Sequence, residues 1–240
     1  MGQLPTYKIA RPSKPFAISN LDNTGPIWMR TTKGRGHKAY KGSIVVFVYF
    51  ATRAVHSEAS SENAADGFIA AYKRFAARRS ISTFLYSDCG TNFVGAERHL
   101  RTLFNEASAF SSTISRYLAH NGTTWHFNPQ AAPHFEGLWE ATVHSVNHHL
   151  RQVLGDTSLT FEEITTFLTL VEACRYLRLL QAQSDDPNDL VQLTPCHFLI
   201  GSPIFTVPEF SLIDLKQNPL QPWQLTRQMY EDFWNRCFFL

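Results

Sequence analysis

The chain has 240 residues, 44% of them hydrophobic and 18% charged, and this composition excludes a disordered or low-complexity protein. Its 22 basic and 20 acidic residues leave a net charge of +2, so binding to nucleic acid would have to come from local clusters of charge. The longest apolar run, residues 44–51, is far too short to span a membrane, and we expect no membrane partner.

The first part of the chain is predicted to form strands. Residues 1–15 carry three prolines among basic and polar residues, which is typical of an extended arm. The segment 16–22 is predicted to be a strand that ends at a turn over 23–26, where Asn, Gly and Pro cluster. Residues 44–50 form a β-branched and aromatic run, the pattern of a strand buried on both faces, and a further strand is expected through Val55.

From Ser61 onward the period of the apolar residues changes to that of helices. A helix with Ser61 as its N-cap is predicted, because apolar side chains recur at helical spacing between Phe68 and Ala76. Strands are then predicted over 82–87 and 123–127, and helices over 93–105, 109–120, 136–154, 160–180 and 223–238. Strands that come first and then alternate with helices predict an α/β fold, a mixed sheet with helices packed on it.

Three carboxylates occupy positions where chemistry is expected. Asp22 closes the first predicted strand, Asp88 follows the fourth, and Glu140 lies on the helix predicted over 136–154. Ligands bind at strand ends of open α/β sheets, and carboxylate oxygens suit Mg²⁺ and Mn²⁺. Two such ions about 4 Å apart can activate an attacking oxygen and stabilise a leaving one in phosphoryl transfer. Spacing alone leaves open that the three acids are turn or surface residues.

The sequence around these acids resembles that of a known family. It is similar to the three acidic motifs of retroviral-type integrase cores, and more closely to integrases of BEL/Pao-type retrotransposons. The acidic motifs read LDNTGP at 21–26, YSDCGTNF at 86–93 and PHFEGLWE at 133–140. The closer likeness adds FATRAVH at 50–56, WHF at 125–127, DPNDL at 186–190, LTP at 193–195 and HFLIG at 197–201.

The resemblance implies a division of the chain. Residues 16–182 would form an RNase H-like integrase catalytic core, a mixed five-stranded sheet flanked by helices. Residues 1–15 would be the extended arm, and residues 183–240 an irregular extension that starts a truncated DNA-binding region. We expect the partners to be DNA, both element ends and target, and further copies of the chain in a nucleoprotein complex. The expected location is inside the cell, in the nucleus when the protein acts on DNA.

The resemblance also implies a reaction. Asp22, Asp88 and Glu140 would be both the catalytic residues and the ligands of two Mg²⁺ or Mn²⁺ ions. The enzyme would be a polynucleotidyl transferase and endonuclease that carries out 3′-end processing and strand transfer, the DNA integration of a retrotransposon. Asp88 and Glu140 are separated by 51 residues, more than in retroviral cores, which indicates an inserted helix near 109–120.

Several residues depart from the family pattern. Cys89 stands where relatives carry Asn, and Glu136 stands where they carry Gly. His144 and Asn147 occupy places where relatives offer lysines, and the segment 176–180 replaces a common Asn-Ser-Arg-Pro-Leu stretch. Two alternatives to an active integrase therefore stay open. One is a decayed or domesticated remnant that binds nucleic acid without catalysis, and the other is a nuclease of the same fold that only hydrolyses DNA.

Two groups of residues are candidates for contact with DNA. Five basic residues fall within the twelve positions 30–41 with no acid among them, although a solvated loop is the alternative. On the predicted helix 136–154, polar residues recur with Glu140 along one face. The pair His144 and His148 lacks a third ligand, so we expect no zinc site there. The candidate DNA contacts are Lys33, Arg35, Lys38, Lys41, His144, Asn147 and Arg151.

Overall fold

The computed structural model describes most of the chain. The described residues are 14–32, 38–110, 123–127, 133–182, 192–204, 207–215 and 221–238, and the side chains of 107–110, 133–140, 182, 222 and 238 fall outside the description. The prediction of an extended arm over 1–15 therefore lies almost entirely outside it.

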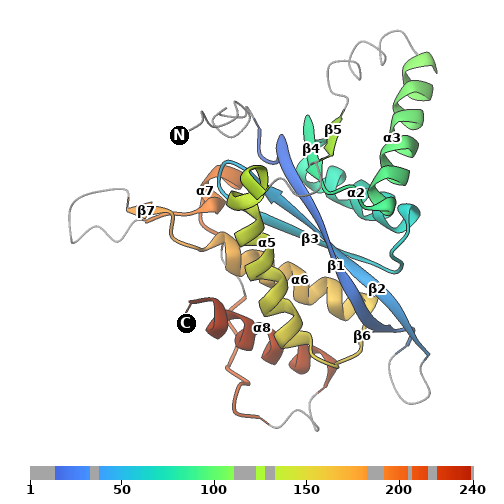
Figure 1. Ribbon diagram of the computed structural model, residues 1–240. Coiled ribbons are helices and arrows are strands. Elements are labelled where there is room, and N and C mark those ends of the chain that lie inside the picture. Colours follow the sequence, from blue (N-terminus) through green and yellow to red (C-terminus); the bar gives the residue numbers. More distant parts are fainter. Residues whose placement is uncertain are drawn as a thin grey trace.

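The sheet is mixed, and Figure 1 shows its strands at the centre of the molecule. Its five main strands lie in the order β3-β2-β1-β4-β5. The strands β1, β2 and β3 pair antiparallel, whereas β4 pairs parallel with β1 and β5 pairs parallel with β4. The predicted RNase H-like mixed sheet is thus confirmed. The strands are β1 (Ile18–Arg30), β2 (Ala39–Tyr49), β3 (Val55–Ser60), β4 (Phe84–Ser87) and β5 (Thr124–Phe127), and β6 (Leu159–Thr160) adds a short pair to β1.

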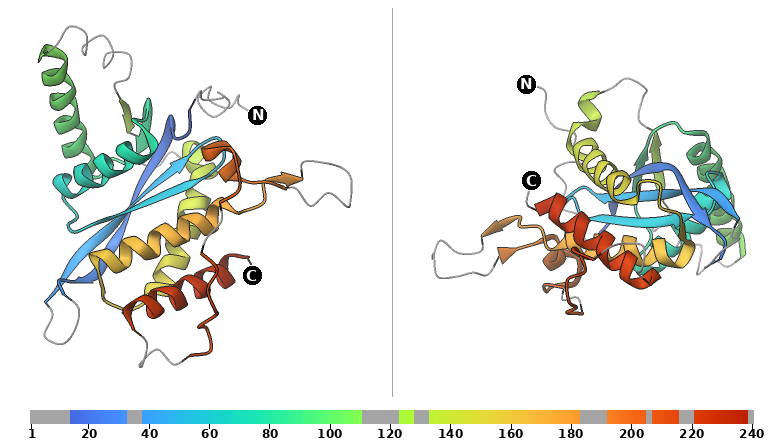
Figure 2. Two further views of the ribbon diagram at one scale, coloured as in Figure 1. Left: turned by 180° about the vertical axis from the view of Figure 1, so that it is seen from behind. Right: turned by 90° about the horizontal axis from the view of Figure 1, so that it is seen from below.

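Helices flank this sheet, as expected. The helix α3 extends away from the sheet beyond α2, whereas α8 lies beside α5 and α6 (Figure 2). A short hairpin of β7 and β8 projects from the body of the molecule (Figure 1). The elements are α2 (Ala65–Arg79), α3 (Thr91–Phe110), α5 (Pro133–Leu154), α6 (Phe161–Tyr176), β7 (Gln181–Ala182), β8 (Gln192–Leu193), α7 (Pro195–Ile200) and α8 (Pro222–Phe238).

The alternation of side chains along β2 divides the core in two. Ile44, Val46 and Val48 pack with α5, α6 and α8 on one face of the sheet. Val45 and Phe47 pack with α2 and α3 on the other. Because successive residues of a strand point to opposite faces, a strand that is apolar throughout has to be covered on both sides. The run 44–50 was predicted to be buried on both faces, and this prediction is confirmed.

The predicted turn at 23–26 is wrong, because β1 continues through it to Arg30. The ladder with β2 is irregular at this point: Thr24 pairs with Ile44, and the next pair is Ile27 with Gly42. A bulge of this kind accommodates Pro26, which has no N–H to donate to the ladder. Pairing with the long strand β2 therefore keeps residues 23–26 within β1, although their composition favours a turn.

Helix boundaries differ from the predictions for local reasons. The first helix, α2, has Ala64 rather than Ser61 at its N-cap, and no side chain caps it. The predicted break between 105 and 109 is absent, since α3 runs continuously to Phe110, and residues 111–122 lie outside the description. The predicted helix 160–180 is shorter, because Thr160 is the N-cap of α6 and Tyr176 its last residue.

The C-terminal part of the chain also contributes to the core. From α8, Met229, Tyr230 and Phe233 pack with α5 and α6, and Phe233 has no exposed surface. The assignment of 183–240 as the start of a DNA-binding region stays a prediction. Among the described residues, no helix combines the length and apolar character that a membrane crossing requires.

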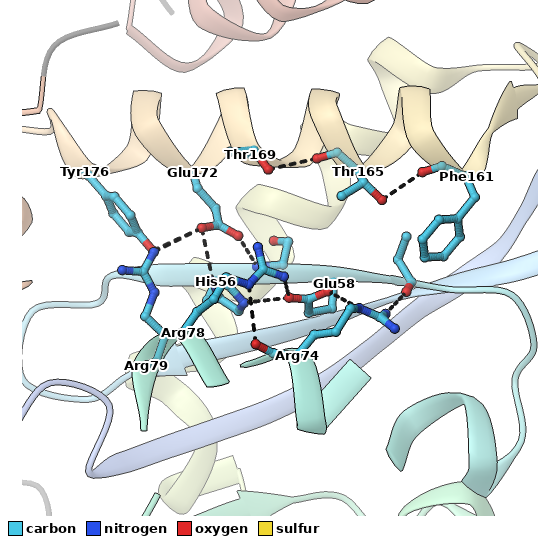
Figure 3. A network of polar contacts seen from close by, with 12 residues as sticks. His56, Glu58, Arg74, Arg78, Arg79, Phe161, Thr165, Thr169, Glu172 and Tyr176 are labelled. Atoms are coloured by element: carbon cyan, nitrogen blue, oxygen red, sulfur yellow. Dashed lines mark hydrogen bonds and ion pairs between the residues drawn. The ribbon is translucent and has the colours of Figure 1, made fainter. Parts of the chain in front are cut away.

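A buried network of charges connects the edge strand β3 to both of its neighbouring helices (Figure 3). His56 and Glu58 come from β3, and they meet Glu172 of α6 and arginines of α2. The sequence predictions included a strand through Val55 and a family motif at 50–56, but not this network.

Candidate functional site

Asp22 lies within β1, on the face of the sheet that α5 covers. Its partner across the antiparallel ladder is Val46, and paired residues point to the same face. Val46 packs with residues of α5 such as Val146. The carboxylate of Asp22 is therefore held between the sheet and α5.

Asp88 takes the corresponding position on the neighbouring parallel strand. Asn20 of β1 pairs with Tyr86 of β4, and Asp22 and Asp88 each follow two residues later. Asp88 itself comes directly after the last residue of β4, Ser87, and is exposed. The topology thus brings two of the three predicted acids to adjacent strands.

The turn after β4 fixes the carboxylate of Asp88. The backbone N–H of Gly90 donates to Asp88 Oδ1 at 3.0 Å. A Cβ at position 90 would lie 2.7 Å from Asn92 Oδ1 and 3.0 Å from Asp88 Oδ1, so only glycine fits without displacing them. The exposed thiol of Cys89, the departure from the family motif, leaves this hydrogen bond in place.

Asn147 of α5 contacts Asp22 directly. Its Nδ2 donates to Asp22 Oδ2 at 3.0 Å, while its Oδ1 is buried and has no hydrogen-bond partner among the described residues. The sequence predicted a polar face on α5 but not this contact. One residue of the predicted DNA-binding set is therefore engaged with a predicted metal ligand.

The electrostatic surroundings raise the pKa of Asp22. Burial is the main cause, since it penalises the charged form. Hydrogen bonds from Asn23 and Asn147 oppose it, the negative charge of Asp88 adds to it, and Arg151 opposes it weakly. The interaction with Asp88 means that the two carboxylates are close enough to repel each other. Such a pair favours binding of a cation.

The third predicted acid, Glu140, belongs to α5, but its side chain lies outside the described residues. It precedes Asn147 by seven residues, two turns of the same helix. Among the side chains that the structure does describe, no group of three or more His, Cys, Asp or Glu residues could hold a metal ion. The convergence of Glu140 with Asp22 and Asp88 stays a prediction.

A cavity of about 500 Å³ opens beside Asp22. Exposed polar side chains of α5 line most of it, and the rings of His144 and His148 stack with their centroids 6.2 Å apart. The sequence predictions did not include His148 or Gln152 in a site, although helical spacing places both beside residues that they did include. The lining residues are Asp22, Val143, His144, Asn147, His148, Arg151 and Gln152.

The basic segment 30–41 is not one loop. Arg30 belongs to β1, and its Nη2 contacts both carboxylate oxygens of Glu163, so its charge is already paired. Lys41 belongs to β2 and lies with its Nζ 5.4 Å from the centre of the Trp28 ring. Lys38 and Lys41 are exposed, and the predicted contacts Lys33 and Arg35 lie outside the described residues.

The chemistry of the described donors fits a hard divalent cation. Asp22 and Asp88 supply carboxylate oxygens, and the unpaired Oδ1 of Asn147 belongs to the amide that contacts Asp22. Mg²⁺ and Mn²⁺ prefer such ligands to nitrogen or sulfur. Among the described residues, His144 and His148 belong to no group of three or more His, Cys, Asp or Glu side chains that could hold a metal ion.

Comparison with known proteins found solved integrase structures that are similar to this chain. No family model and no curated protein matches the chain. It is similar to a chain of the simian T-cell lymphotropic virus intasome in complex with PP2A regulatory subunit B56 gamma, with 13% identity and a TM-score of 0.49 over 87% of this chain and 63% of that one. It is also similar to the HTLV-2 integrase catalytic core domain in complex with magnesium. For the trimeric form the identity is 15% and the TM-score 0.43, covering 78% of this chain and 99% of that one. For the dimeric form the identity is 14% and the TM-score 0.44, covering 78% of this chain and 98% of that one.

Proposed function

We propose that the chain is the catalytic core of a retrotransposon integrase of the BEL/Pao type, which processes and joins DNA ends in a metal-dependent reaction. The observation that carries the proposal is the placement of Asp22 and Asp88 at corresponding positions of adjacent parallel strands, with Asp22 in contact with the helix that contains Glu140. The sequence around all three acids resembles the integrase motifs, which supports the same assignment.

The three acids would hold two Mg²⁺ or Mn²⁺ ions through their carboxylate oxygens. When bound, the two ions activate the attacking oxygen and stabilise the leaving oxygen of a phosphoryl transfer. The chain prepares its carboxylates for this role. The N–H of Gly90 holds the Asp88 carboxylate and Asn147 holds that of Asp22, and the burial of Asp22 together with repulsion by Asp88 favours a cation beside Asp22.

The cavity beside Asp22 would receive the DNA backbone. His144, His148 and Arg151 line it with donors that suit phosphate oxygens, and they are exposed. Contacts of this kind position the nucleic acid without reading its sequence. The partners proposed are element ends and target DNA, and further copies of the chain in one nucleoprotein complex, acting in the nucleus.

A non-catalytic role is the second candidate. The exposed His144 and the partly buried Asn147 stand where relatives carry lysines, so the chain would offer less fixed positive charge to phosphate than they do. A remnant that binds nucleic acid would need the cavity but not the metal ions. A nuclease of the same fold would need the ions but would not join ends.

A strand-transfer assay separates these functions. The full chain is incubated with Mn²⁺, a pre-cut donor end and target duplex, and the products are scored for joining and for cutting. Joining that is lost in Asp88→Asn and kept in Asp156→Asn, an exposed acid beyond α5, supports the integrase. Cutting without joining indicates the nuclease, and DNA binding with neither product indicates the remnant. Equal thermal unfolding of both variants shows that the fold is intact.

A further inference from the structure

Asn147 uses only one end of its amide, the Nδ2 group, in the contact with Asp22. Its Nδ2 donates to Asp22 Oδ2 at 3.0 Å, but its Oδ1 is buried and accepts no hydrogen bond from the described residues. A buried acceptor without a donor is unfavourable, because it has lost its contacts with water and gained none. The orphaned oxygen also lies on the same amide that touches a predicted metal ligand.

We propose that Asn147 is part of the metal site. Its amide holds the Asp22 carboxylate while no cation is bound, and its carbonyl oxygen becomes a further ligand when a divalent cation binds. This inference rests on the proposed function, since it takes Asp22 as a metal ligand. It adds a residue that the acidic motifs do not contain.

An asparagine can serve both the metal-free and the metal-bound state, whereas the lysine that relatives carry at this position cannot. A planar amide carries donors and an acceptor at the same end, and the torsion that exchanges them is broad and roughly two-fold. A lysine would offer only donors, and its fixed charge would oppose a cation beside Asp22. Amide carbonyl oxygens are ordinary ligands of hard divalent cations.

The position of Asn147 allows an ion to reach it. Asn147 and Asp22 both line the cavity of about 500 Å³, which has room for a hydrated ion. The other charged side chain in that lining is Arg151, one turn further along α5, and it affects the pKa of Asp22 only weakly. The side chain of α5 that hydrogen-bonds to the Asp22 carboxylate is therefore a neutral group that can change its orientation.

Two other roles for Asn147 predict different results. An amide that only competes with the cation for Asp22 would weaken metal binding, so its removal would tighten that binding. An amide that only braces α5 against β1 would affect stability and leave metal affinity unchanged. Loss of an oxygen ligand, in contrast, weakens the binding of the ion.

The test is a Mn²⁺ titration of the full chain, with free Mn²⁺ measured by electron paramagnetic resonance. Asn147→Leu keeps the approximate size and removes both polar atoms, and we expect it to weaken Mn²⁺ binding about tenfold or more. Asn147→Asp restores an oxygen and should bind at least as tightly as the wild type. Asn105→Leu is the matched control, because it makes the same substitution at an exposed position of α3, outside this cavity, and should leave affinity unchanged. Unchanged or tighter binding in Asn147→Leu overturns the inference.

The same titration distinguishes this inference from the proposed function. Asp22→Asn and Asp88→Asn should each abolish tight Mn²⁺ binding. If they do so while Asn147→Leu binds normally, the proposed function stands and the role of Asn147 is refuted. If the wild-type chain binds no Mn²⁺, the metal-dependent function itself is refuted. Thermal unfolding of each variant shows whether it is folded. If Asn147→Leu does not fold, Asn147→Asp keeps the test decisive.

Discussion

His56 Nδ1 of the edge strand β3 lies 3.1 Å from Glu172 Oε2 of helix α6. The other ring nitrogen, Nε2, lies 2.9 Å from Glu58 Oε1, and the side chains of His56 and Glu58 are each 1% exposed. Both ring nitrogens therefore face carboxylate oxygens, which accept hydrogen bonds and do not donate them when ionised. His56 satisfies both contacts only as the doubly protonated imidazolium.

Arginines and backbone groups complete this network (Figure 3). Arg74 Nε donates to Glu58 Oε2 at 2.8 Å, and Arg78 also contacts Glu58. Glu172 accepts from the backbone N–H of Ser57 at 2.7 Å and from Arg79 at 3.4 Å. Each carboxylate thus has several donors, which is the condition under which buried charges are tolerated.

The network predicts that stability depends on the charge of His56. Burial alone would lower the pKa of His56, but Glu172 and Glu58 outweigh it and raise the pKa above its ordinary value of 6.5. The stabilisation is therefore fully present below about pH 6.5 and is lost as pH rises through the raised pKa. We expect the free energy of unfolding, measured with urea, to fall over that range.

Substitution of His56 checks this assignment. His56→Gln should lower the free energy of unfolding at pH 6 by about 3–5 kcal/mol, because it leaves buried carboxylates with fewer partners. The substitution should also reduce the decline of the free energy of unfolding above pH 6.5. His148→Gln, at an exposed histidine, serves as the control. Parallel pH profiles for the wild type and His56→Gln would show that His56 is not charged in the folded state.

The start of α6 gives a second prediction, on stability alone. Thr160 is the N-cap in a capping box: its side chain accepts from the backbone N–H of Glu163, and Glu163 Oε2 accepts from the N–H of Thr160 at 2.8 Å. Thr160→Ala should lower the free energy of unfolding by about 1 kcal/mol. Thr160→Ser should retain most of the stabilisation by the cap, because its hydroxyl can accept the same hydrogen bond. Urea denaturation measures both, and an equal loss in the two variants would argue against the cap.

The sequence predicted the sheet well, because the signal of its strand β2 is local. The apolar run 44–50 needs covering on both faces wherever it occurs. The continuation of β1 past Pro26 was not predictable in the same way, since it depends on pairing with another strand, β2. Ser61 is a good N-cap by type, but packing of α2 sets its start at Ala65.

The candidate site was predictable in part for a similar reason. Strand order places Asp22 beside Asp88 once the sheet is correct, and motifs mark both residues. Which residue of the polar face of α5 meets Asp22 depends on how the helix crosses the sheet, so the role of Asn147 required the structure. The contact of His56 with Glu172 likewise joins residues 116 positions apart, and no local pattern encodes it.

The packing of α5 gives a third prediction. Leu150 has no exposed surface and packs in the core that α5 shares with α6 and α8. Leu150→Ala should lower the free energy of unfolding by about 2–5 kcal/mol, since it removes buried methyl groups and leaves a cavity. Val94→Ala on the exposed side of α3 is the control and should change it by less than about 0.5 kcal/mol. A small effect at Leu150 would mean that α5 is not firmly packed on the sheet.

The fourth prediction tests whether this face of α5 meets DNA, and it rests on the proposed function. His144 is exposed and lines the cavity beside Asp22, where a phosphate would bind. His144→Lys adds a fixed charge, so affinity for duplex DNA should rise. The slope of log affinity against log salt should steepen by about one unit, because one more phosphate contact releases its counterion. A titration with fluorescent duplex at several salt concentrations measures both quantities.

A second lysine separates DNA binding from metal binding at the same site. Adding Asn147→Lys to His144→Lys should steepen the salt slope by about two units in total, yet it places a positive charge against Asp22 and should weaken Mn²⁺ binding. Ala70→Lys, on an exposed position of α2 across the sheet, adds the same charge away from the cavity and should leave the slope unchanged. If the double variant has the wild-type slope, this helix face does not contact the DNA backbone. If Ala70→Lys steepens the slope equally, the gain comes from net charge and not from the site.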